Sequence, residues 1–403
     1  MSLGLAACAG SAPAGDDSAG GTIGGKTLTI YSSLPLQGAD RARSQAIVNG
    51  EKLALVERGG KIGGFTVKYV SLDDSTASAG MWDPGATLTN ARKAVLDQTT
   101  IAYLGELDSL ASAISIPLLN EAGILQVSPG SPYAGLTTSD GAEKGEPDKY
   151  YPTGRRTFGR VVPSDGAQAA AQAAYQRQEG CTRLHVLNDK EVEGKGLALG
   201  VAGAARTIGI AIAREDAFDP AASSFRDVGE RVAASGADCV FAAMSSQQDA
   251  VRLWGALHAA APAAKLFGSD RIAGPAFASG LGASEQAVTF LTEPTLGPGH
   301  YPSMEREMLR RYERRFGEPA PPDAARGYEA MSVVLDAIER AGARASVRQE
   351  VVDAFFATRS RDSVLGRYSI DADGDMALGR YGGYVVRRGE LVLERVLGAA
   401  TKG

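Results

Sequence analysis

The sequence predicts an α/β protein made of two similar doubly wound, Rossmann-like lobes. Short apolar and β-branched runs alternate with helical patterns, as expected for a parallel sheet covered by helices on both faces. The same alternation then starts a second time. A chain of 403 residues also exceeds the size at which one hydrophobic core usually stops growing. These observations indicate two lobes with a cleft between them, at the carboxyl ends of the strands.

The first repeat begins at Lys26 and alternates strands with helices. Strands are expected at 27–32, 66–72, 101–105 and 124–128, and helices at 44–58, 88–98 and 109–122. A stretch rich in Gly, Pro and charged residues, 137–157, then reads as an excursion over the surface. The chain is expected to cross into the second lobe at 158–163.

The second repeat has the same rhythm. Strands are expected at 183–188, 210–218, 239–243 and 265–268, and helices at 166–179, 194–208, 224–234 and 247–260. Two further helical patterns follow at 303–316 and 324–341. The C-terminal part is expected to form an antiparallel meander of strands 368–370, 382–387 and 390–396, with turns at Asp373-Gly374 and Arg388-Gly389.

Composition and charge exclude some classes of protein. The net charge is −5, from 42 basic and 47 acidic residues, so the chain has no basic excess with which to neutralise nucleic-acid phosphates. A DNA-binding regulator of this fold would need an N-terminal helix-turn-helix, which residues 1–25 cannot form. No apolar run approaches the roughly 20 residues that span a bilayer. We therefore expect no nucleic-acid partner, and contact with a membrane only through an anchor.

The N-terminus predicts such an anchor. Leu5-Ala6-Ala7-Cys8 has the small-residue pattern that precedes a lipidated cysteine in bacterial lipoproteins, and the polar stretch 9–22 is typical of a tether. Residues 1–25 are thus interpreted as a lipoprotein signal remnant and flexible tether. The alternative is a chance cysteine in an Ala-rich terminus. With Cys8 lipidated, the protein would lie on the outer face of the plasma membrane, or in the periplasm.

The remaining cysteines, Cys181 and Cys239, each stand at the front of a predicted strand. These are the first and third strands of one sheet, which are neighbours in a flavodoxin-like order. In an oxidising compartment the two cysteines could form a disulfide. Two buried free thiols, packed like small hydrophobic side chains, are the other possibility.

A search for catalytic patterns finds none. The chain has three histidines, His185, His258 and His300, which are far apart and outside any metal-ligand spacing. There is no nucleophile elbow, P-loop or zincin helix. We therefore expect no enzyme, no metal and no cofactor.

Two weaker motifs have structural explanations. Gly194-Lys195-Gly196 follows a predicted strand, but Leu199 stands where the third Gly of a dinucleotide fingerprint belongs. Three aspartates around Gly374 resemble half of a calcium loop, but Gly382 occupies the position of its bidentate Glu. The first is interpreted as a strand-to-helix turn and the second as a β-turn rich in Asp and Gly.

The ends of the predicted strands carry the candidate ligand residues. Asp108 and Ser109 lie where a strand passes into a helix, so the hydroxyl and the free amides of the first turn could hold a carboxylate. Alternatively, one of the two simply caps the helix. A second strand end, 127–133, includes Gly130, Ser131 and Tyr133. In the other lobe Asp270 supplies an acid, and together these groups would suit a zwitterion.

At these residues the chain resembles the branched-chain amino-acid-type (Leu/Ile/Val-type) solute-binding proteins of ABC importers, which have the type I periplasmic-binding fold. The resemblance is strongest over 30–163 and depends on the order of its motifs: SLPLQG (33–38), SLDD (71–74), GELDS (105–109), NEAGI (120–124), VSP (127–129), GLT (135–137), GYEA (327–330) and GD (374–375). No single motif is specific.

The resemblance implies roles for particular residues. In that family a Ser matching Ser109 and the loop matching 130–132 hold the ligand carboxylate, while an acid matching Asp270 meets the ammonium. Two positions depart from the pattern: Pro132 replaces a Thr, and Glu193 stands near the place of an aromatic residue. We therefore expect a polar or non-standard amino acid, or another small acid or amide, as ligand. The loop that contains Gln37 completes the predicted site.

The resemblance also implies discontinuous lobes joined by a three-strand hinge. One lobe would comprise 26–158 plus 294–365 and the other 159–293 plus 366–400, with hinge closure over the ligand. The partners would be ABC permease subunits, and the receptor would be a monomer. A ligand sensor of the same fold, which signals to a receptor or regulator instead of a permease, is the alternative function.

Overall fold

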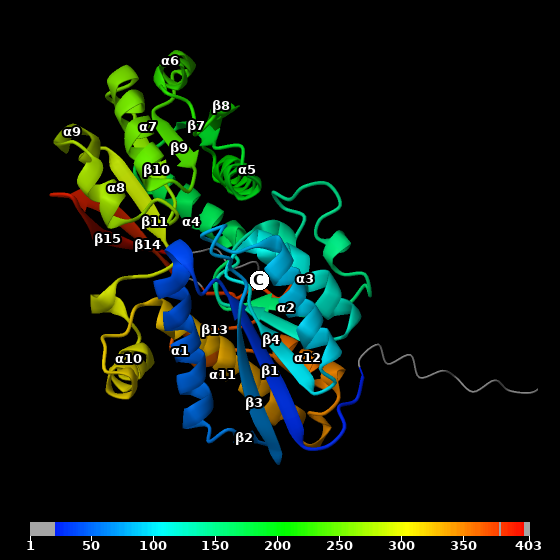
Figure 1. Cartoon of the computed structure of the whole chain (residues 1–403). Helices are drawn as coiled ribbons and strands as arrows, with labels where there is room; N and C mark the ends of the chain where they lie inside the picture. The colour runs from blue at the N-terminus through cyan, green and yellow to red at the C-terminus, as the bar shows by residue number, and fades with distance from the viewer. Residues whose placement is uncertain (1–20, 379, 399–403) are drawn as a thin grey trace, which may run out of the picture.

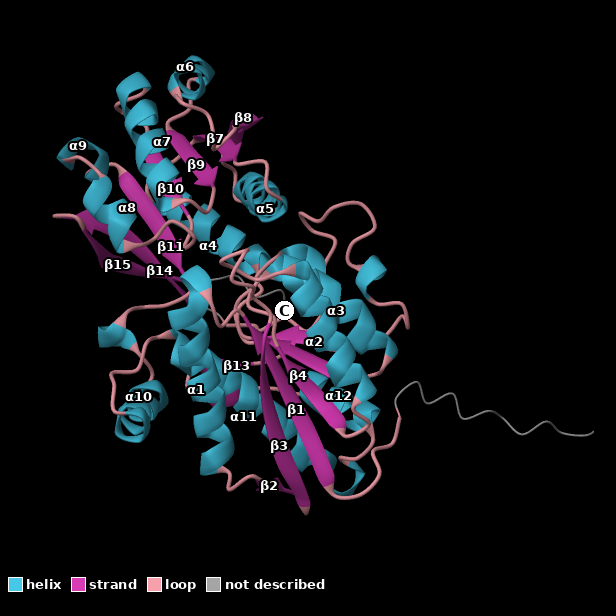
Figure 2. Cartoon of the chain, in the orientation of Figure 1, coloured by secondary structure: helices cyan, strands magenta, loops and turns pink. Residues whose placement is uncertain are grey.

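The computed structural model describes residues 21–378 and 380–398, which form two large sheets, each with its own helices (Figures 1 and 2). The first sheet has the order β2-β3-β1-β4-β5-β6, and the second has the order β15-β14-β11-β10-β9-β7-β8. A small third sheet pairs β12 with β13. We call each large sheet with the helices packed on it a lobe. Cys8, the predicted lipidation site, lies outside the described residues.

The first sheet is parallel except at its edge strand β2. Its strands are β1 Thr27–Leu34, β2 Lys61–Ile62, β3 Phe65–Asp73, β4 Thr100–Leu104, β5 Leu125–Ser128 and β6 Phe158–Arg160. Successive side chains of a strand point to opposite faces. Ile30 accordingly packs in a core with helices α11 and α12 (Asp323–Ala341 and Arg348–Phe356), while Tyr31 packs in another with α2 and α3 (Pro84–Leu96 and Ser109–Glu121). The sheet is therefore covered on both faces.

The second sheet begins with five parallel strands in the flavodoxin-like order and ends with an antiparallel hairpin. Its strands are β7 Arg183–Asn188, β8 Ala211–Ala217, β9 Cys239–Ala243, β10 Lys265–Gly268, β11 Thr289–Glu293, β14 Arg380–Arg387 and β15 Glu390–Gly398. One face packs on α4 and α5 (Asp165–Gln178 and Val192–Thr207). The other packs on α6, α7 and α8 (Arg226–Ser235, Gln247–Ala260 and Pro275–Gly280), and α9 is Ala283–Gln286.

The predicted parallel α/β architecture is confirmed, whereas the C-terminal meander is wrong in part. The hairpin with a turn at Arg388-Gly389 is present as β14 and β15. The predicted strand 368–370 does not join it, because β13, Gly366–Tyr368, pairs with β12, Arg361–Ser363. Residue alternation identifies a strand but not its partner, since pairing is decided by distant segments. The sequence analysis also missed β11 and α12.

The chain passes between the lobes three times. It leaves the first lobe after β6, returns after β11, and leaves again before β14. On the return, α10 (Ser303–Phe316) and α11 pack with α1 (Arg41–Glu57). Tyr368, Ile370 and Met376 belong to the core of the first sheet. The third crossover therefore lies between Met376 and Arg380, later than the boundary expected at 365.

Helices α1 and α11 touch through two glycines. A Cβ atom on Gly50 would lie 2.1 Å from the carbonyl oxygen of Ala324, and one on Gly327 would lie 2.1 Å from that of Ile47. Both obstacles are backbone atoms, which cannot rotate away as a side chain can. The two helices can therefore approach this closely only because both positions lack a side chain.

We expect Gly327→Ala to lower the free energy of unfolding by about 2–3 kcal/mol, since the helices must separate to admit the methyl group. The measurement is urea denaturation followed by circular dichroism. Gly203→Ala in α5 is the matched control, because no atom lies within 4 Å of its Cβ position. That control should be neutral or slightly stabilising. An equal loss in both variants would contradict the close contact.

Candidate functional site

The N-terminus of α3 presents Asp108 and Ser109 at the carboxyl end of β4. Asp108 is the cap: its carboxylate accepts a 2.8 Å hydrogen bond from the amide of Leu110. Ser109 is the first helical residue and is buried, and its hydroxyl oxygen accepts a 3.3 Å hydrogen bond from the amide of Tyr133. Because Asp108 makes the cap, the Ser109 hydroxyl is not used for capping; its oxygen accepts from Tyr133, and its proton can be donated to a ligand.

The loop that follows β5 is tied tightly to the loop that follows β4. The Ser128 hydroxyl accepts hydrogen bonds from the amides of Gly130 and Ser131, at 3.0 and 2.9 Å, and donates to the Glu106 carbonyl at 2.7 Å. The Ser131 hydroxyl is buried and also bonds the Glu106 carbonyl, at 3.1 Å. A Cβ atom on Gly130 would lie 2.7 Å from the Leu107 carbonyl oxygen, so this close approach requires glycine.

Tyr133 holds the surface excursion in place. Its buried hydroxyl donates to Glu146 at 2.6 Å, as does the hydroxyl of Tyr150. Burial raises the pKa of Glu146, but the hydrogen bonds from the two phenols, from Lys149 and from the Glu143 amide together outweigh burial and lower the pKa below its ordinary value. On the other side, a Cβ atom on Gly196 of α5 would lie 2.7 Å from the Tyr133 ring. Tyr133 therefore packs between the excursion and the second lobe.

Gln37 lies in the loop after β1. Its side chain is exposed and donates a 2.8 Å hydrogen bond to the carboxylate of Asp73, at the end of β3. Its amide donates to the hydroxyl of Ser75 at 3.0 Å. Gln37 thus joins two neighbouring strand ends of the first sheet.

In the second lobe, Glu193 and Asp270 are joined by a residue that the sequence analysis missed. Glu193 is in the first turn of α5 and forms an ion pair with Arg271, which follows Asp270 after β10. Asp270 accepts a 2.7 Å hydrogen bond from Gln168 of α4. The available signal was Glu193 itself, because an acid in place of an aromatic residue requires a counter-ion.

Asp165 is a second residue that the sequence analysis missed. It is the first residue of α4, directly after the chain has crossed into the second lobe, and it is 2% exposed. Among the described residues, neither of its carboxylate oxygens has a hydrogen-bond partner. Burial raises its pKa to about 7; Arg271 opposes this shift, and the negative charges of Glu193 and Asp270 reinforce it.

Charges of the second lobe also act on Asp108, which follows β4 in the first lobe. Burial and the negative charge of Glu193 together raise the pKa of Asp108 to about 6, although the hydrogen bond from the Leu110 amide and the charge of Arg271 oppose this shift. The structure thus brings together groups from both lobes, which we call the interlobe cluster: Asp108, Asp165, Glu193, Asp270 and Arg271.

Comparison with known proteins decides the family. A model of the periplasmic binding protein family matches residues 27–387. The chain belongs to this family. No curated protein sequence matched it. Members of the family bind solutes, so this chain is a solute-binding protein and not an enzyme, and family membership places it outside the cytoplasm.

Solved structures of similar fold agree with this assignment. A leucine binding protein from Thermotoga maritima is 21% identical with a TM-score of 0.72, over 92% of this chain and 99% of that one. A putative branched-chain amino acid ABC transporter protein from Rhodospirillum rubrum is 24% identical with a TM-score of 0.70, over 91% and 100%. A solute binding protein from R. palustris in complex with benzoate is 17% identical with a TM-score of 0.69, over 93% and 97%.

The fully buried guanidinium of Arg160 anchors the loop that follows β5 in this binding protein. The Arg160 side chain, at the end of β6, forms a 2.7 Å ion pair with Asp375. It also donates to the carbonyl oxygens of Ser131 and Tyr133, at 2.8 and 2.9 Å, and to the Thr137 hydroxyl. The turn that contains Asp375, half of a calcium loop by sequence, thus supplies the counter-ion for a guanidinium.

A Ser-His-Asp arrangement in the second lobe is structural. His185 of β7 lies between Ser235 and Asp216, at 3.1 and 3.2 Å. The Ser235 hydroxyl donates its proton to the Val232 carbonyl at 2.6 Å, so the proton is not directed at the imidazole. Burial lowers the pKa of His185, although Asp216 opposes this shift. The arrangement stabilises the end of α6 and fits a binding protein.

Cys181 and Cys239 are joined by a disulfide in this structure, with a Cα–Cα distance of 5.8 Å. Asp238 lies beside them, and the three residues together have the composition of a metal site. Bonded sulfurs offer no thiolate ligands, so the disulfide excludes a metal here. The bond connects the starts of β7 and β9, which are neighbours in the sheet.

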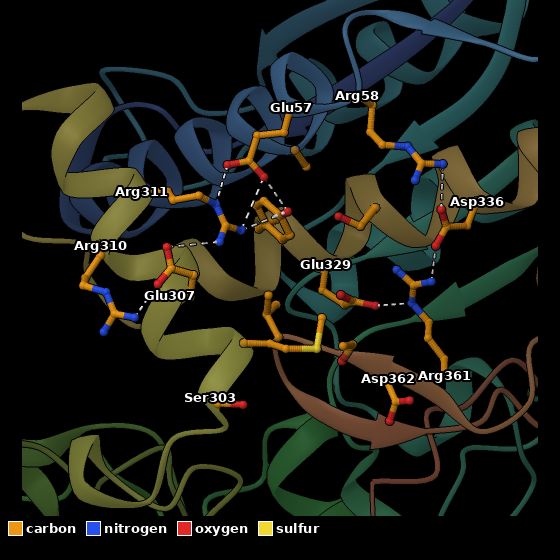
Figure 3. Close-up of a pocket in the computed structure, with 16 residues that line it drawn as sticks. Glu57, Arg58, Ser303, Glu307, Arg310, Arg311, Glu329, Asp336, Arg361 and Asp362 are labelled. Carbon is orange, nitrogen blue, oxygen red and sulfur yellow. Dashed lines mark hydrogen bonds and ion pairs between the residues drawn. The ribbon is translucent and has the colours of Figure 1, made fainter.

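A groove of about 750 Å³ lies on the first lobe, where α1, α10, α11 and β12 meet (Figure 3). Most of its charged residues are paired with one another: Glu57 with Arg311, Arg58 with Asp336, and Arg361 with both Glu329 and Asp336. These ion pairs connect α1, α10, α11 and β12 and so stabilise the packing of the first lobe.

None of the helices in the described part of the chain combines the length and the apolar character that crossing a bilayer requires.

Proposed function

We propose that this periplasmic binding protein is the receptor of an ABC importer and binds a small polar solute, such as an amino acid, between its lobes. The observation that carries the proposal is the interlobe cluster. Asp108 comes from the first lobe and the other members come from the second, so a ligand between them would contact both lobes at once. A ligand that contacts both lobes favours the state in which they are closed around it.

The lobes in this proposal are those expected from the sequence, 26–158 plus 294–365 and 159–293 plus 366–400, with the last boundary moved to the crossover between Met376 and Arg380. The hydroxyl of Ser109 and the free amides at the start of α3 would hold a carboxylate of the ligand. Asp270 would face the ligand ammonium. The hydroxyl of Ser131 is used within the protein, so it would not replace the hydroxyl that Pro132 lacks.

Delivery would take place at the membrane surface. The closed receptor, as a monomer, would dock on permease subunits, and a lipid on Cys8 would keep it near them. The structural neighbours named for leucine and for benzoate support a small carboxylate-bearing solute as the ligand class.

Ser109→Ala and Asp270→Asn should each weaken solute binding by about ten- to one-hundred-fold, because each removes a hydrogen bond to a charged group of the ligand. A thermal-shift screen of amino acids, carboxylates, amides and diamines finds the ligand, and isothermal titration calorimetry measures its affinity. Ser279→Ala, an exposed serine of α8, is the control and should not change the affinity. Unchanged binding in both site variants would contradict this placement.

The importer role has its own test. Deletion of the gene should abolish uptake of the radiolabelled solute by cells, and the intact gene should restore it. Unchanged uptake in the deletion strain would contradict the importer role.

A further inference from the structure

The interlobe cluster contains more negative than positive groups. Four carboxyl groups surround one guanidinium, that of Arg271, whose side chain is 20% exposed. Burial disfavours the charged guanidinium, but Glu193, Asp165 and Asp270 outweigh burial and raise the pKa of Arg271. Arg271 is therefore cationic and forms its ion pair with Glu193. One positive charge cannot neutralise the remaining acids.

Asp165 is the acid that most needs a partner. It is almost fully buried, and among the described residues its two oxygens accept no hydrogen bond. A buried carboxylate without a partner is costly, and native structures rarely keep one without a reason. The Arg160 guanidinium is near enough to affect Asp165, but its donors go to Asp375, to two carbonyl oxygens and to the Thr137 hydroxyl. The described part of the protein thus supplies Asp165 with no hydrogen-bond donor.

The charge balance distinguishes between classes of solute. An anion such as a benzoate would add a negative charge to four carboxyl groups. A zwitterion such as leucine adds no net charge, and its one ammonium would satisfy one acid. A solute with more positive than negative groups would supply charged donors both to Asp270 and to Asp165.

We propose that this receptor binds a small organic cation that also carries a carboxylate, namely a basic amino acid, with Asp165, Glu193 and Asp270 of the second lobe and Asp108 of the first as its counter-ions. This inference rests on the proposed function and names the substrate class of the same site. In the absence of solute, Arg271 partly neutralises the cluster and holds Glu193 in place. The cationic solute supplies the positive charge that remains missing.

The test is calorimetry of the full chain at pH 8 with arginine, lysine and ornithine, compared with leucine, glutamate and benzoate. At least one of the three cations should bind one to one, with an affinity at least about ten-fold above that of the other three compounds. Preferred binding of leucine, glutamate or benzoate would overturn the cation proposal and leave the solute-receptor function standing. Binding of none of the six would overturn the cation proposal, and a thermal-shift screen without any hit would count against the receptor function itself.

Variants locate the charge that matters. Asp165→Asn and Glu193→Gln should each lower the affinity for the cation by at least about ten-fold, since each removes a buried counter-ion. Asp227→Asn, an exposed acid of α6, makes the same change in net charge and should have no effect. Full affinity in both cluster variants would overturn the proposal.

The pH profile gives a second readout. Burial raises the pKa of Asp165 to about 7, the charges of Arg271, Glu193, Asp270 and Arg160 act on it, and the phenol of Tyr381 in β14 is near enough to feel its charge. A cationic solute binds the ionised carboxylate, so binding releases a proton. Its affinity should rise by at least about ten-fold from pH 6 to pH 8, and in Asp165→Asn the rise should shrink to the roughly two-fold that Asp108, with a pKa of about 6, contributes. An affinity that falls over this range would overturn the proposal.

Discussion

Replacement of Arg160 by methionine should lower the free energy of unfolding by about 3–5 kcal/mol. The reason is that the guanidinium is fully buried and paired with Asp375, and removal of one partner of a buried ion pair leaves an uncompensated charge. The carbonyl oxygens of Ser131 and Tyr133 would lose a donor at the same time. Urea denaturation followed by circular dichroism measures the change, and the same variant should bind solute more weakly because the loop after β5 loses its support.

Arg226→Met is the matched control for this prediction. Arg226 is an exposed residue at the start of α6, where loss of a guanidinium should change the free energy of unfolding by less than about 0.5 kcal/mol. A second variant, Arg160→Met with Asp375→Leu, removes both charges and should recover part of the loss. A loss below about 1 kcal/mol in the single variant would contradict the role assigned to Arg160.

Reduction of the disulfide between Cys181 and Cys239 should lower the free energy of unfolding by about 4 kcal/mol. The bond closes a loop with a sequence separation of 58 residues, and a loop of this length restricts the unfolded chain strongly. Denaturation curves with and without reductant measure the effect. In the double variant Cys181→Ser with Cys239→Ser, reductant should have no effect, and the protein should be about as stable as the reduced wild type. Equal stability of oxidised and reduced wild type would refute the prediction.

The regular part of the fold is predictable from the sequence because it depends on local patterns. Apolar runs locate β7, β9 and β10, and helical periodicity locates α7 and α10, with the observed bounds. The pairing of short strands is not predictable in this way. β12 and β13 carry little pattern of their own, and β11 follows a stretch of weak helices, so only the assembled sheet identifies their partners.

The candidate site shows the same division. Asp108, Ser109 and Asp270 stand at ends of strands, and the rule that parallel strands direct their carboxyl ends to one side is enough to select them. Arg271 and Asp165 could not be selected in this way. Their importance depends on Glu193, which is distant in the sequence and meets them only after the second lobe has folded.

The close contact between α1 and α11 also determines when the first lobe can form during synthesis. A chain made from its N-terminus completes β1 to β6 by residue 160, but α11 and α12, which cover one face of that sheet, end only at Ala341 and Phe356. Until then Ile30, Ala102 and Leu104 lack the apolar surface on which they finally pack. Contacts so distant in sequence form slowly. The nascent first lobe therefore stays incomplete, with an apolar sheet face uncovered, until most of the 403 residues exist.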